Sequence, residues 1–260
     1  MVTQDHDITK EFTQSVIDVA LHAGKAIMEV YESGNFEESL KSDSSPLTKA
    51  DKVSHRIIVD GLAVLDETIP ILSEEGSQIS YEERKHWRRF WLVDPLDGTK
   101  EFLKRNGEFT VNIALIEGGR PILGVIYIPA TGVLYYGERK RGAFRRSADG
   151  ATEQIRVVPP ENGKIIAARS RSHAAPEEED FFKRHGVTET VSAGSSLKFC
   201  LVAEGKAHVY YRHGPTMEWD TAAGQAIAEN AGCRVLRFDR DEALIYNKES
   251  LLNPWFVVLR

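Results

Sequence analysis

The chain contains the stretch Trp91-Leu92-Val93-Asp94-Pro95-Leu96-Asp97-Gly98-Thr99-Lys100-Glu101-Phe102, in which an apolar run ends in two carboxylates three residues apart. The apolar part predicts a buried strand, so Asp94 and Asp97 would lie at its exposed end. Pro95 restricts the backbone between them, and Gly98 permits a tight turn directly after them. Because two nearby carboxylates repel each other, a cation is the simplest partner for the pair. The stretch therefore predicts a strand that delivers metal ligands, followed by a turn with free N–H groups.

Other uses of paired acids demand other spacings. An EF-hand calcium loop needs acids at alternate positions and a Glu at position 12, where counting from Asp94 gives Arg105. The Asp-x-Asp pattern of aspartyl-phosphate enzymes also needs alternate acids. A plain Asp-Gly β-turn remains as the structural alternative. The apolar run before Asp94, and Thr99-Lys100-Glu101 after it, favour the metal interpretation.

The composition is that of an acidic globular protein. The 260 residues are 42% hydrophobic, which is enough for one large domain or two small ones. No apolar run approaches the ~20 residues of a membrane span, and the first residues lack the basic and apolar regions of a secretion signal. Cys200 and Cys233 lie in stretches that predict helix, and we expect buried thiols in a reducing compartment.

The charge balance bears on the partners of the chain. A net charge of −6 argues against binding to a nucleic-acid polymer. Two basic runs, Glu83–Arg89 and Arg139–Arg146, are interpreted as solvated loop or hairpin surface. An acidic protein that acts on an anionic substrate needs local cations, and bound metal ions would supply them.

Hydrophobic periodicity divides the chain into two halves. Apolar residues at helical spacing predict helices over residues 11–33 and from Thr48 onward, and alternating segments predict a largely antiparallel sheet. A polar Pro-Pro stretch near residues 157–163 marks a boundary, beyond which strands and helices alternate in an α/β pattern. The strands are expected over 69–72, 109–117, 121–128, 133–136, 142–144, 165–168 and 190–191 and near 209, 235 and 257, and the later helices over 177–185, 195–204 and 221–231.

Three further acids occupy the ends of predicted elements. Glu74 follows a short apolar run, Asp51 lies at a helix start, and Asp220 opens a helix rich in small residues. Each has a structural alternative, namely a solvated loop acid for Glu74, a capping box with Thr48 for Asp51, and an N-cap for Asp220. Magnesium takes hard oxygen ligands and usually couples carboxylates to phosphate oxygens. Together with Asp94, such acids suit a pair of ions about 4 Å apart that clamps a phosphoryl group.

These residues carry a resemblance to a known family. The segments Glu74-Glu75, Asp94-Pro-Leu-Asp97-Gly-Thr99 and Trp219-Asp220-Thr-Ala-Ala-Gly224 resemble the three motifs of the inositol monophosphatase superfamily, in order and at fitting spacing. The resemblance extends from the first helix to Asn253-Pro254. It implies an α+β fold, a layered α/β/α/β/α sandwich. It also implies two domains, residues 1–158 with most metal ligands and residues 159–260 with substrate-binding residues and Asp220.

The resemblance further implies a lithium-sensitive phosphatase with two or three Mg²⁺ ions. Glu74, Asp94 and the carbonyl of Leu96 would bind one ion, and Asp94, Asp97 and Asp220 a second. Thr99 and Asp51 would orient and deprotonate the attacking water, and Glu74 would share in catalysis. Gly98, Thr99 and Lys100 would hold the departing phosphate. No covalent intermediate is implied.

Within the superfamily, three stretches look like the branch of bacterial 3′(2′),5′-bisphosphate nucleotidases, namely Trp91–Phe102, Lys104–Asn112 and Gly194–Gly205. This implies cleavage of 3′-phosphoadenosine 5′-phosphate to AMP and phosphate, which recycles a by-product of sulfur assimilation. The substrate-binding residues matched to that branch are Gly194, Ser195, Lys198 and Arg212, together with Asp220. His173, within Ser172-His173, would contact the base or be a loop residue without a role.

Other functions remain open on the sequence alone. Another phosphatase of the superfamily would act on inositol monophosphate or fructose 1,6-bisphosphate, but a single phosphate would not need Ser195, Lys198 and Arg212. A non-catalytic magnesium or nucleotide sensor is disfavoured because all five acids and Thr99 are present. The expected location is the cytoplasm, and any contact with the cytoplasmic face of the inner membrane is expected to be peripheral. The oligomeric state and activity on the sulfate-bearing nucleotide stay open.

Overall fold

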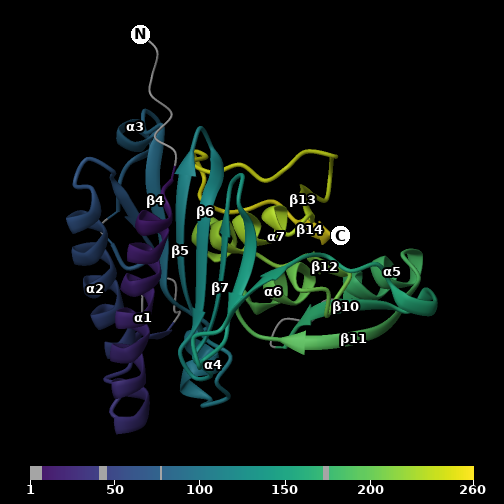
Figure 1. Ribbon diagram of the computed structural model, residues 1–260, viewed down its shortest axis with the longest axis horizontal. Helices are drawn as coiled ribbons and strands as arrows, with labels where there is room; N and C mark the ends of the chain where they lie inside the picture. The colour runs from purple at the N-terminus through teal and green to yellow at the C-terminus, as the bar shows by residue number, and fades with distance from the viewer. Residues whose placement is uncertain (1–7, 41–45, 77, 172–175) are drawn as a thin grey trace.

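Five layers of helices and sheets build the molecule (Figure 1). The computed structural model describes residues 8–40, 46–76, 78–171 and 176–260. From one side to the other, the layers are a helix pair, a seven-stranded sheet, a second helix pair, a five-stranded sheet and a last helix. The expected α+β fold, a layered α/β/α/β/α sandwich, is therefore confirmed. The five helices of these layers are α1 Lys10–Ser33, α2 Lys49–Leu65, α6 Leu197–Ala203, α7 Glu218–Asn230 and α5 Pro176–Arg184.

The seven-stranded sheet has the order β3-β4-β5-β6-β7-β8-β9. Only the β3–β4 pair is parallel, and the remaining pairs are antiparallel, as expected for a meander of hairpins. The short helices α3 Tyr81–Arg84 and α4 Thr99–Leu103 flank β4 along the chain. The strands are β3 Ile71–Ser73, β4 Arg89–Asp97, β5 Thr110–Glu117, β6 Arg120–Ile128, β7 Val133–Glu138, β8 Gly142–Arg146 and β9 Thr152–Ile155.

Helices α1 and α2 cover the outer face of this sheet. Thr9 caps α1 through its side chain, and Gly34 ends the helix in the left-handed conformation (φ 69°). The apolar stripe of α1 packs with residues of α2 and of strands β4 to β7 in one hydrophobic cluster. Between the two helices, β1 Ser39–Leu40 pairs with β2 Pro46–Leu47.

The five-stranded sheet has the order β11-β10-β12-β14-β13. Strand β10 pairs in parallel with both neighbours, whereas β14 pairs antiparallel with β12 and β13. Helix α5 packs on its outer face through Phe181 and Phe182. Its strands are β10 Ile165–Ser170, β11 Val187–Ala193, β12 Val209–Arg212, β13 Arg234–Arg237 and β14 Phe256–Leu259, and the 3-10 turn η1 Glu161–Gly163 precedes them.

Helix α7 lies between the two sheets and contacts both. Close approach to the larger sheet depends on glycines, because a Cβ on Gly124 would lie 2.4 Å from the carbonyl oxygen of Ala223. The alanines of α7 share one cluster with β4 and β6 residues, and Ala228 joins the cluster under the smaller sheet. Although each sheet comes from one half of the chain, α7 joins their cores. The division into domains 1–158 and 159–260 stays a prediction.

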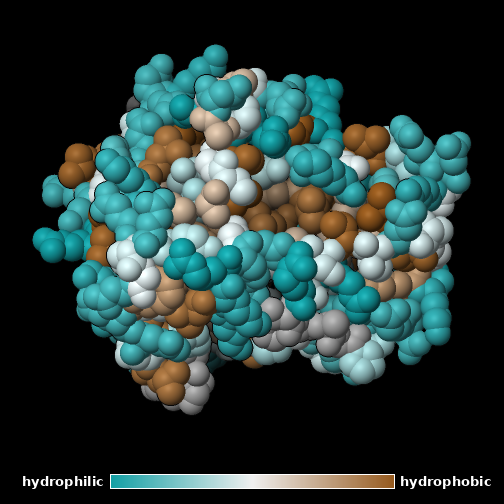
Figure 2. All heavy atoms as spheres, turned by 90° about the horizontal axis from the view of Figure 1, so that it is seen from below, coloured by the Kyte–Doolittle hydropathy of each residue, from teal (hydrophilic) through white to brown (hydrophobic). Residues whose placement is uncertain are grey.

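Surface charge follows the expected pattern, with one correction. Charged and polar side chains cover most of the face in Figure 2, and hydrophobic ones show mainly near its middle. In the run 139–146, Arg139, Arg141 and Arg145 pair with acids at the hairpin surface. Arg84 differs, because it is only 3% exposed. The interpretation of the run 83–89 as solvated surface is therefore wrong for this residue.

The remaining expectations from the sequence concern the two cysteines and a possible membrane-spanning helix. Cys200 and Cys233 are free and buried, as expected. Cys200 lies in α6, whereas Cys233 lies just beyond the turn after α7, not within a helix. Within the described ranges of the chain, no helix has both the length and the apolar character that a membrane crossing demands.

Candidate active site

Asp94 and Asp97 lie at the end of β4, where the strand leaves its regular pairing. Asp94 pairs with Asn112 of β5, and the register shifts before Asp97 pairs with Thr110. Asp94 Oδ1 accepts a hydrogen bond from the Leu96 N–H (3.1 Å), which folds the carboxylate back over the irregular segment. Proline and an irregular register at a strand end re-aim side chains. Both carboxylates thus come from one short segment, as the sequence predicted.

Asp51 makes two compatible contacts at once, a helix cap with Thr48 and a hydrogen bond with Thr99. One carboxylate oxygen accepts from the N–H (2.7 Å) and the hydroxyl (2.6 Å) of Thr48, which completes a capping box at α2. The other oxygen accepts from the Thr99 hydroxyl at 3.3 Å. Asp51 is 1% exposed, so its orientation is fixed by buried contacts. The cap therefore aims Asp51 at Thr99.

Four acids lie within one another's electric field. Burial raises the pKa of Asp94 well above its usual value, and the charges of Glu74, Asp97 and Asp220 raise it further. Burial also raises the pKa of Asp97 to about 6, and burial followed by the charges of Asp97 and Glu74 raises that of Asp220. Glu74 follows β3, which is parallel to β4, so both strands deliver an acid at the same edge. Such a set disfavours its own ionisation unless a cation is present.

This donor set fits Mg²⁺. Buried carboxylates that repel one another gain most from a hard divalent cation, which relieves the repulsion. Among the described residues, no three His, Cys, Asp or Glu side chains are gathered tightly enough to hold a metal ion by themselves. Magnesium tolerates this, because it usually binds one or two carboxylates and keeps water or phosphate oxygens as its other ligands.

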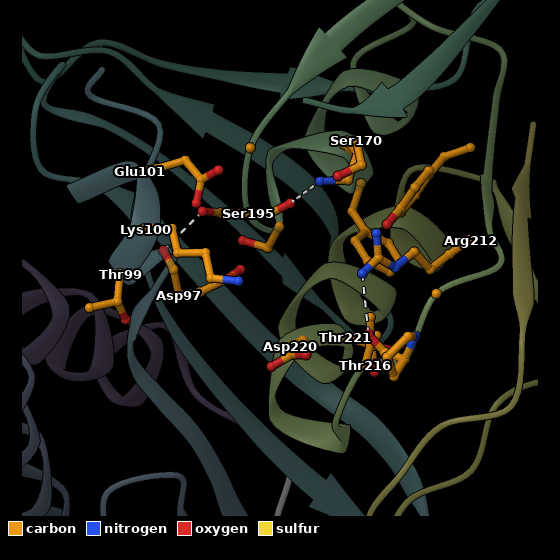
Figure 3. Close-up of a pocket in the computed structure, with 18 of the residues that line it drawn as sticks. Asp97, Thr99, Lys100, Glu101, Ser170, Ser195, Arg212, Thr216, Asp220 and Thr221 are labelled. Atoms are coloured by element: carbon orange, nitrogen blue, oxygen red, sulfur yellow. Dashed lines mark hydrogen bonds between the residues drawn. The ribbon is translucent and has the colours of Figure 1, made fainter. Parts of the chain in front are cut away.

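A cavity of about 310 Å³ opens beside these acids. Figure 3 shows Asp97 and Thr99 on one wall and Ser170 and Arg212 on the opposite wall. The cavity therefore lies between elements of both sheets. Its lining includes the predicted residues Glu74, Asp97, Gly98, Thr99, Lys100, Gly194, Ser195, Lys198, Arg212 and Asp220.

The turn at Gly98 packs against Ser195. Gly98 has φ 92°, and a Cβ there would lie 2.1 Å from the Ser195 hydroxyl oxygen, so only glycine fits. Ser195 itself has φ 46°, and its hydroxyl donates to the carbonyls of Asp97 (2.9 Å) and Glu108 (2.7 Å). The Gly194 N–H donates to the Glu108 carboxylate at 2.8 Å. This differs from the expectation of a phosphate at Gly194, because a carboxylate from the first half of the chain already accepts that N–H.

Two buried cations also line the cavity. Lys198 is 4% exposed and donates to the carbonyls of Ala193 (3.2 Å) and Ser195 (2.5 Å). Burial lowers the pKa of Lys198 to about 8, against the attraction of Asp97. Arg212 is 8% exposed and donates to the Pro215 carbonyl at 3.2 Å, while its Nε has no hydrogen-bond partner among the described residues. A buried guanidinium with an unused donor favours an anion.

The remaining predicted residues take other places. Asp51, Asp94 and Leu96 are buried behind the cavity wall, and His173 lies outside the described residues. Asp220 is the third residue of α7 rather than its N-cap, and its carboxylate accepts from the Met217 N–H at 2.8 Å.

Sequence reasoning missed several residues at the cavity. Ser170 ends β10 and Tyr210 lies in β12, and neither belongs to a recognisable motif. Asn112 lies behind the lining residues, where its amide donates to Asp97 Oδ2 at 3.2 Å and its side-chain carbonyl accepts from the Ser196 hydroxyl at 2.8 Å. Only its position opposite Asp94 in an antiparallel pair could have identified it.

The chain belongs to the inositol monophosphatase family, whose model matches residues 9–256. It is 48% identical to the 3′(2′),5′-bisphosphate nucleotidase CysQ of Salmonella typhimurium, over 94% of this chain and 98% of that protein. It is also 48% identical to the protein of the same name from Escherichia coli K12, over 94% and 97% of the two chains. The crystal structure of CysQ from Bacteroides thetaiotaomicron, a bacterial member of the family, matches with a TM-score of 0.86 at 45% identity, over 96% of this chain and 97% of that one.

Proposed function

We propose that this protein is a magnesium-dependent 3′(2′),5′-bisphosphate nucleotidase that converts 3′-phosphoadenosine 5′-phosphate to AMP and phosphate. The observation that carries the proposal is a single cavity lined both by acids and by buried cations. Asp97 and Asp220 line it together with Lys198 and Arg212. One phosphate of a bisphosphate would lie at the acids with Mg²⁺, and the other at the cations. The nearly full-length similarity to proteins named for this activity supports the assignment.

Glu74, Asp94, Asp97, Asp220 and the carbonyl of Leu96 would hold two or three Mg²⁺ ions. Bound there, the metal would act as a Lewis acid that lowers the pKa of water and neutralises charge on the phosphate. Protein groups alone would leave the carboxylates of Glu74, Asp97 and Asp220 facing an anionic substrate. The same residues therefore serve the proposed reaction only with metal present, which makes activity dependent on Mg²⁺.

Thr99 and Asp51 would handle the proton of the attacking water. The Thr99 hydroxyl donates to Asp51 at 3.3 Å, so its lone pairs face away from that carboxylate and can accept from water. Asp51 is held by Thr48 and can take the proton through Thr99. Water then forms the new P–O bond, the bond to the 3′ oxygen breaks, and a proton returns to that oxygen to give the nucleotide hydroxyl.

The second phosphate would lie at Lys198 and Arg212. Arg212 offers an N–H without a partner among the described residues, and Lys198 offers a charge one turn from Ser195. Lys100 lines the cavity near the acids and would contact the phosphate that leaves. We place the activity in the cytoplasm, in keeping with two free buried cysteines. Contact with the inner membrane would be peripheral.

A phosphate-release assay tests the proposal. The substrates are 3′-phosphoadenosine 5′-phosphate, AMP, inositol 1-phosphate and fructose 1,6-bisphosphate, each with Mg²⁺, with EDTA, and with Mg²⁺ plus lithium. We expect the highest kcat/KM for the bisphosphate nucleotide, none without Mg²⁺, and inhibition by lithium. A higher kcat/KM for inositol 1-phosphate or fructose 1,6-bisphosphate would refute the substrate assignment. Absence of turnover on every substrate would favour a sensor.

A further inference from the structure

The basic run 83–89 contains a buried arginine that the proposed reaction does not use. The Arg84 guanidinium donates to the carbonyls of Lys248 (2.6 Å) and Glu249 (2.8 Å) and to the side-chain oxygen of Asn247 (2.9 Å). The side-chain amide of Asn247 in turn donates a hydrogen bond to the Arg84 carbonyl at 2.6 Å. Arg84 ends α3, in the connection between Glu74 and β4. The turn at 247–249 is therefore fastened to the segment that joins two of the acid-bearing elements.

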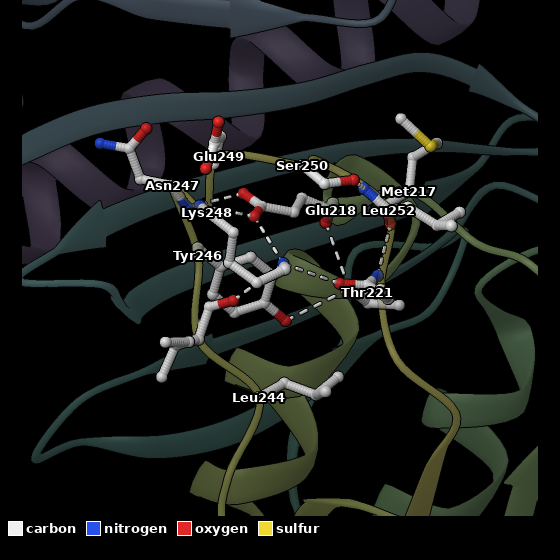
Figure 4. Close-up of polar contacts among 12 residues, drawn as sticks. Met217, Glu218, Thr221, Leu244, Tyr246, Asn247, Lys248, Glu249, Ser250 and Leu252 are labelled. Atoms are coloured by element: carbon white, nitrogen blue, oxygen red, sulfur yellow. Dashed lines mark hydrogen bonds and ion pairs between the residues drawn. The ribbon is translucent and has the colours of Figure 1, made fainter. Parts of the chain in front are cut away.

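The same turn also holds the first residue of α7. Glu218 is fully buried, and its carboxylate accepts from the N–H groups of Asn247 (2.7 Å) and Lys248 (3.0 Å). The Lys248 ammonium lies 2.5 Å from the same carboxylate (Figure 4). Because a buried carboxylate is tolerated only when it is paired and hydrogen-bonded, Glu218 has one favourable position.

Further contacts fix the next turn of the helix. The Thr221 hydroxyl accepts from the Asn253 amide (3.0 Å) and the Tyr246 hydroxyl (3.3 Å), as Figure 4 shows for Tyr246. The Asn253 amide also donates to the Met217 carbonyl at 2.7 Å. Asp220 lies between Glu218 and Thr221 in the sequence. The segment 246–253 thus holds the helix on both sides of Asp220.

We propose that Glu218 is a positioning residue for Mg²⁺ binding. Its ion pair with Lys248, braced by Arg84, sets where α7 presents Asp220 to the acids at the ends of β3 and β4. Mg²⁺ demands near-ideal octahedral geometry, so a small displacement of one ligand weakens binding. Groups that orient ligands typically change metal affinity about 10–100-fold when they are altered. The inference rests on the proposed function, because it takes Asp220 to be a ligand.

Glu218→Gln tests this, because it keeps the shape of the side chain and removes the charge that Lys248 faces. The Mg²⁺ dissociation constant is measured on substrate-free protein from the dependence of Tm on Mg²⁺ concentration. We expect it to rise about tenfold while the far-UV circular dichroism spectrum stays unchanged.

Glu229→Gln is the matched control. Glu229 lies near the other end of α7 and accepts from Arg120 at 2.8 and 3.0 Å, so the substitution also breaks an ion pair of the same helix. Because Glu229 is remote from Asp220, its Mg²⁺ dissociation constant should change by less than about twofold. Wild-type Mg²⁺ affinity in Glu218→Gln, or an equal loss in Glu229→Gln, would overturn the inference.

Further variants cover the remaining outcomes. If Glu218→Gln does not fold, the Mg²⁺ dissociation constant of Lys248→Met tests the inference instead, and we expect it to rise. Lys248→Arg should keep wild-type Mg²⁺ affinity, because arginine supplies the cation that Glu218 needs. Unchanged Mg²⁺ affinity in Lys248→Met would then overturn the inference. Asp220→Asn separates the two proposals. Wild-type Mg²⁺ affinity in Asp220→Asn would refute Asp220 as a ligand, whereas loss there with retention in the positioning variants would refute only the role of Glu218.

Discussion

At the scale of the residue, the surroundings of Asp94 disfavour the ionised form of its carboxyl group. It is 2% exposed, and burial and three neighbouring acids raise its pKa. A carboxyl whose folded pKa exceeds its unfolded value binds more protons in the folded state. The metal-free protein therefore loses stability as the pH rises from the unfolded pKa through the raised folded pKa. The loss grows with pH across that window, and removing the charge should restore stability.

We expect Asp94→Asn to raise the Tm of the metal-free protein at pH 7.5, by roughly 2–4 °C for each kcal/mol regained. The same change should lower phosphate release about a thousandfold, since a bound metal contributes several kcal/mol to the transition state. Thermal unfolding in EDTA and the phosphate assay measure the two effects. Asp60→Asn, at an exposed position of α2, is the control and should change neither. A lower Tm for Asp94→Asn would contradict the account.

Lys198 gives a prediction for the pH dependence of activity. Its pKa is lowered to about 8, so it loses its charge as the pH rises through that value. The kcat/KM for the bisphosphate nucleotide should then fall about tenfold or more above pH 8, since a charge-assisted hydrogen bond contributes about 1.5–3 kcal/mol. The Lys198→Met variant should have a low kcat/KM for the bisphosphate nucleotide, and this value should not decline above pH 8. A monophosphate such as p-nitrophenyl phosphate should also lack it, and a decline there would point to another group.

Single residues also show where sequence reasoning stops. The acids could be predicted, because each follows an apolar run or starts a helix, and those patterns are local. Glu108 could not, because it accepts from Gly194 across 86 positions of sequence and its pairing exists only in the folded chain. The prediction of Arg84 as a solvated surface residue failed because its partners also lie far away in the sequence. Its partners are backbone carbonyls 164 and 165 residues away, which no local pattern reveals.

At the scale of the element, α7 depends on the absence of side chains beneath it. A Cβ on Gly124 of β6 would lie 2.4 Å from a carbonyl oxygen of the helix. Gly124→Ala should therefore destabilise the protein by about 1–3 kcal/mol and shift α7, with loss of both Mg²⁺ affinity and activity. Gly118→Ala is the control, because Gly118 has φ 57° and no atom of the described residues lies within 4 Å of the added Cβ. It should lose a similar stability, about 1–2 kcal/mol, and keep its activity. Equal activity in both variants would contradict a role for this close approach.

Element types were predictable where one face is buried. Helix α1 begins and ends within a residue of the predicted segment, and α2 begins where it was predicted, because an apolar stripe repeats along each. Strand β9 was missed and β11 was expected at only two residues. Both lie at sheet edges, and their sequences, Thr152–Ile155 and Val187–Ala193, are largely exposed. Edge strands of this kind lack the apolar alternation that identifies a half-buried strand.

At the scale of the whole molecule, the two sheets are joined by a shared core. One hydrophobic cluster contains Phe90 and Ile126 of the larger sheet together with Ala223 and Ile227 of α7 and Cys200 of α6. Two halves that share buried surface should unfold together. We expect one transition in calorimetry, with equal calorimetric and van't Hoff enthalpies. In each variant that keeps a single tryptophan, Trp91 in β4 or Trp219 in α7, tryptophan fluorescence and far-UV circular dichroism should report the same Tm. Two separate midpoints would instead support independent domains.

Magnesium should act on both halves at once. Asp94 comes from the first half and Asp220 from the second, and their mutual repulsion opposes the closing of the halves on each other. A cation shared between them reverses this, so binding stabilises the joined state rather than either half. At a hundredfold excess over the dissociation constant, the gain of about 2.7 kcal/mol should raise Tm by roughly 5–10 °C. The Trp91 and Trp219 variants should shift by the same amount. A shift at only one tryptophan would show that the metal binds within one half, and the bridging role of the acids would be wrong.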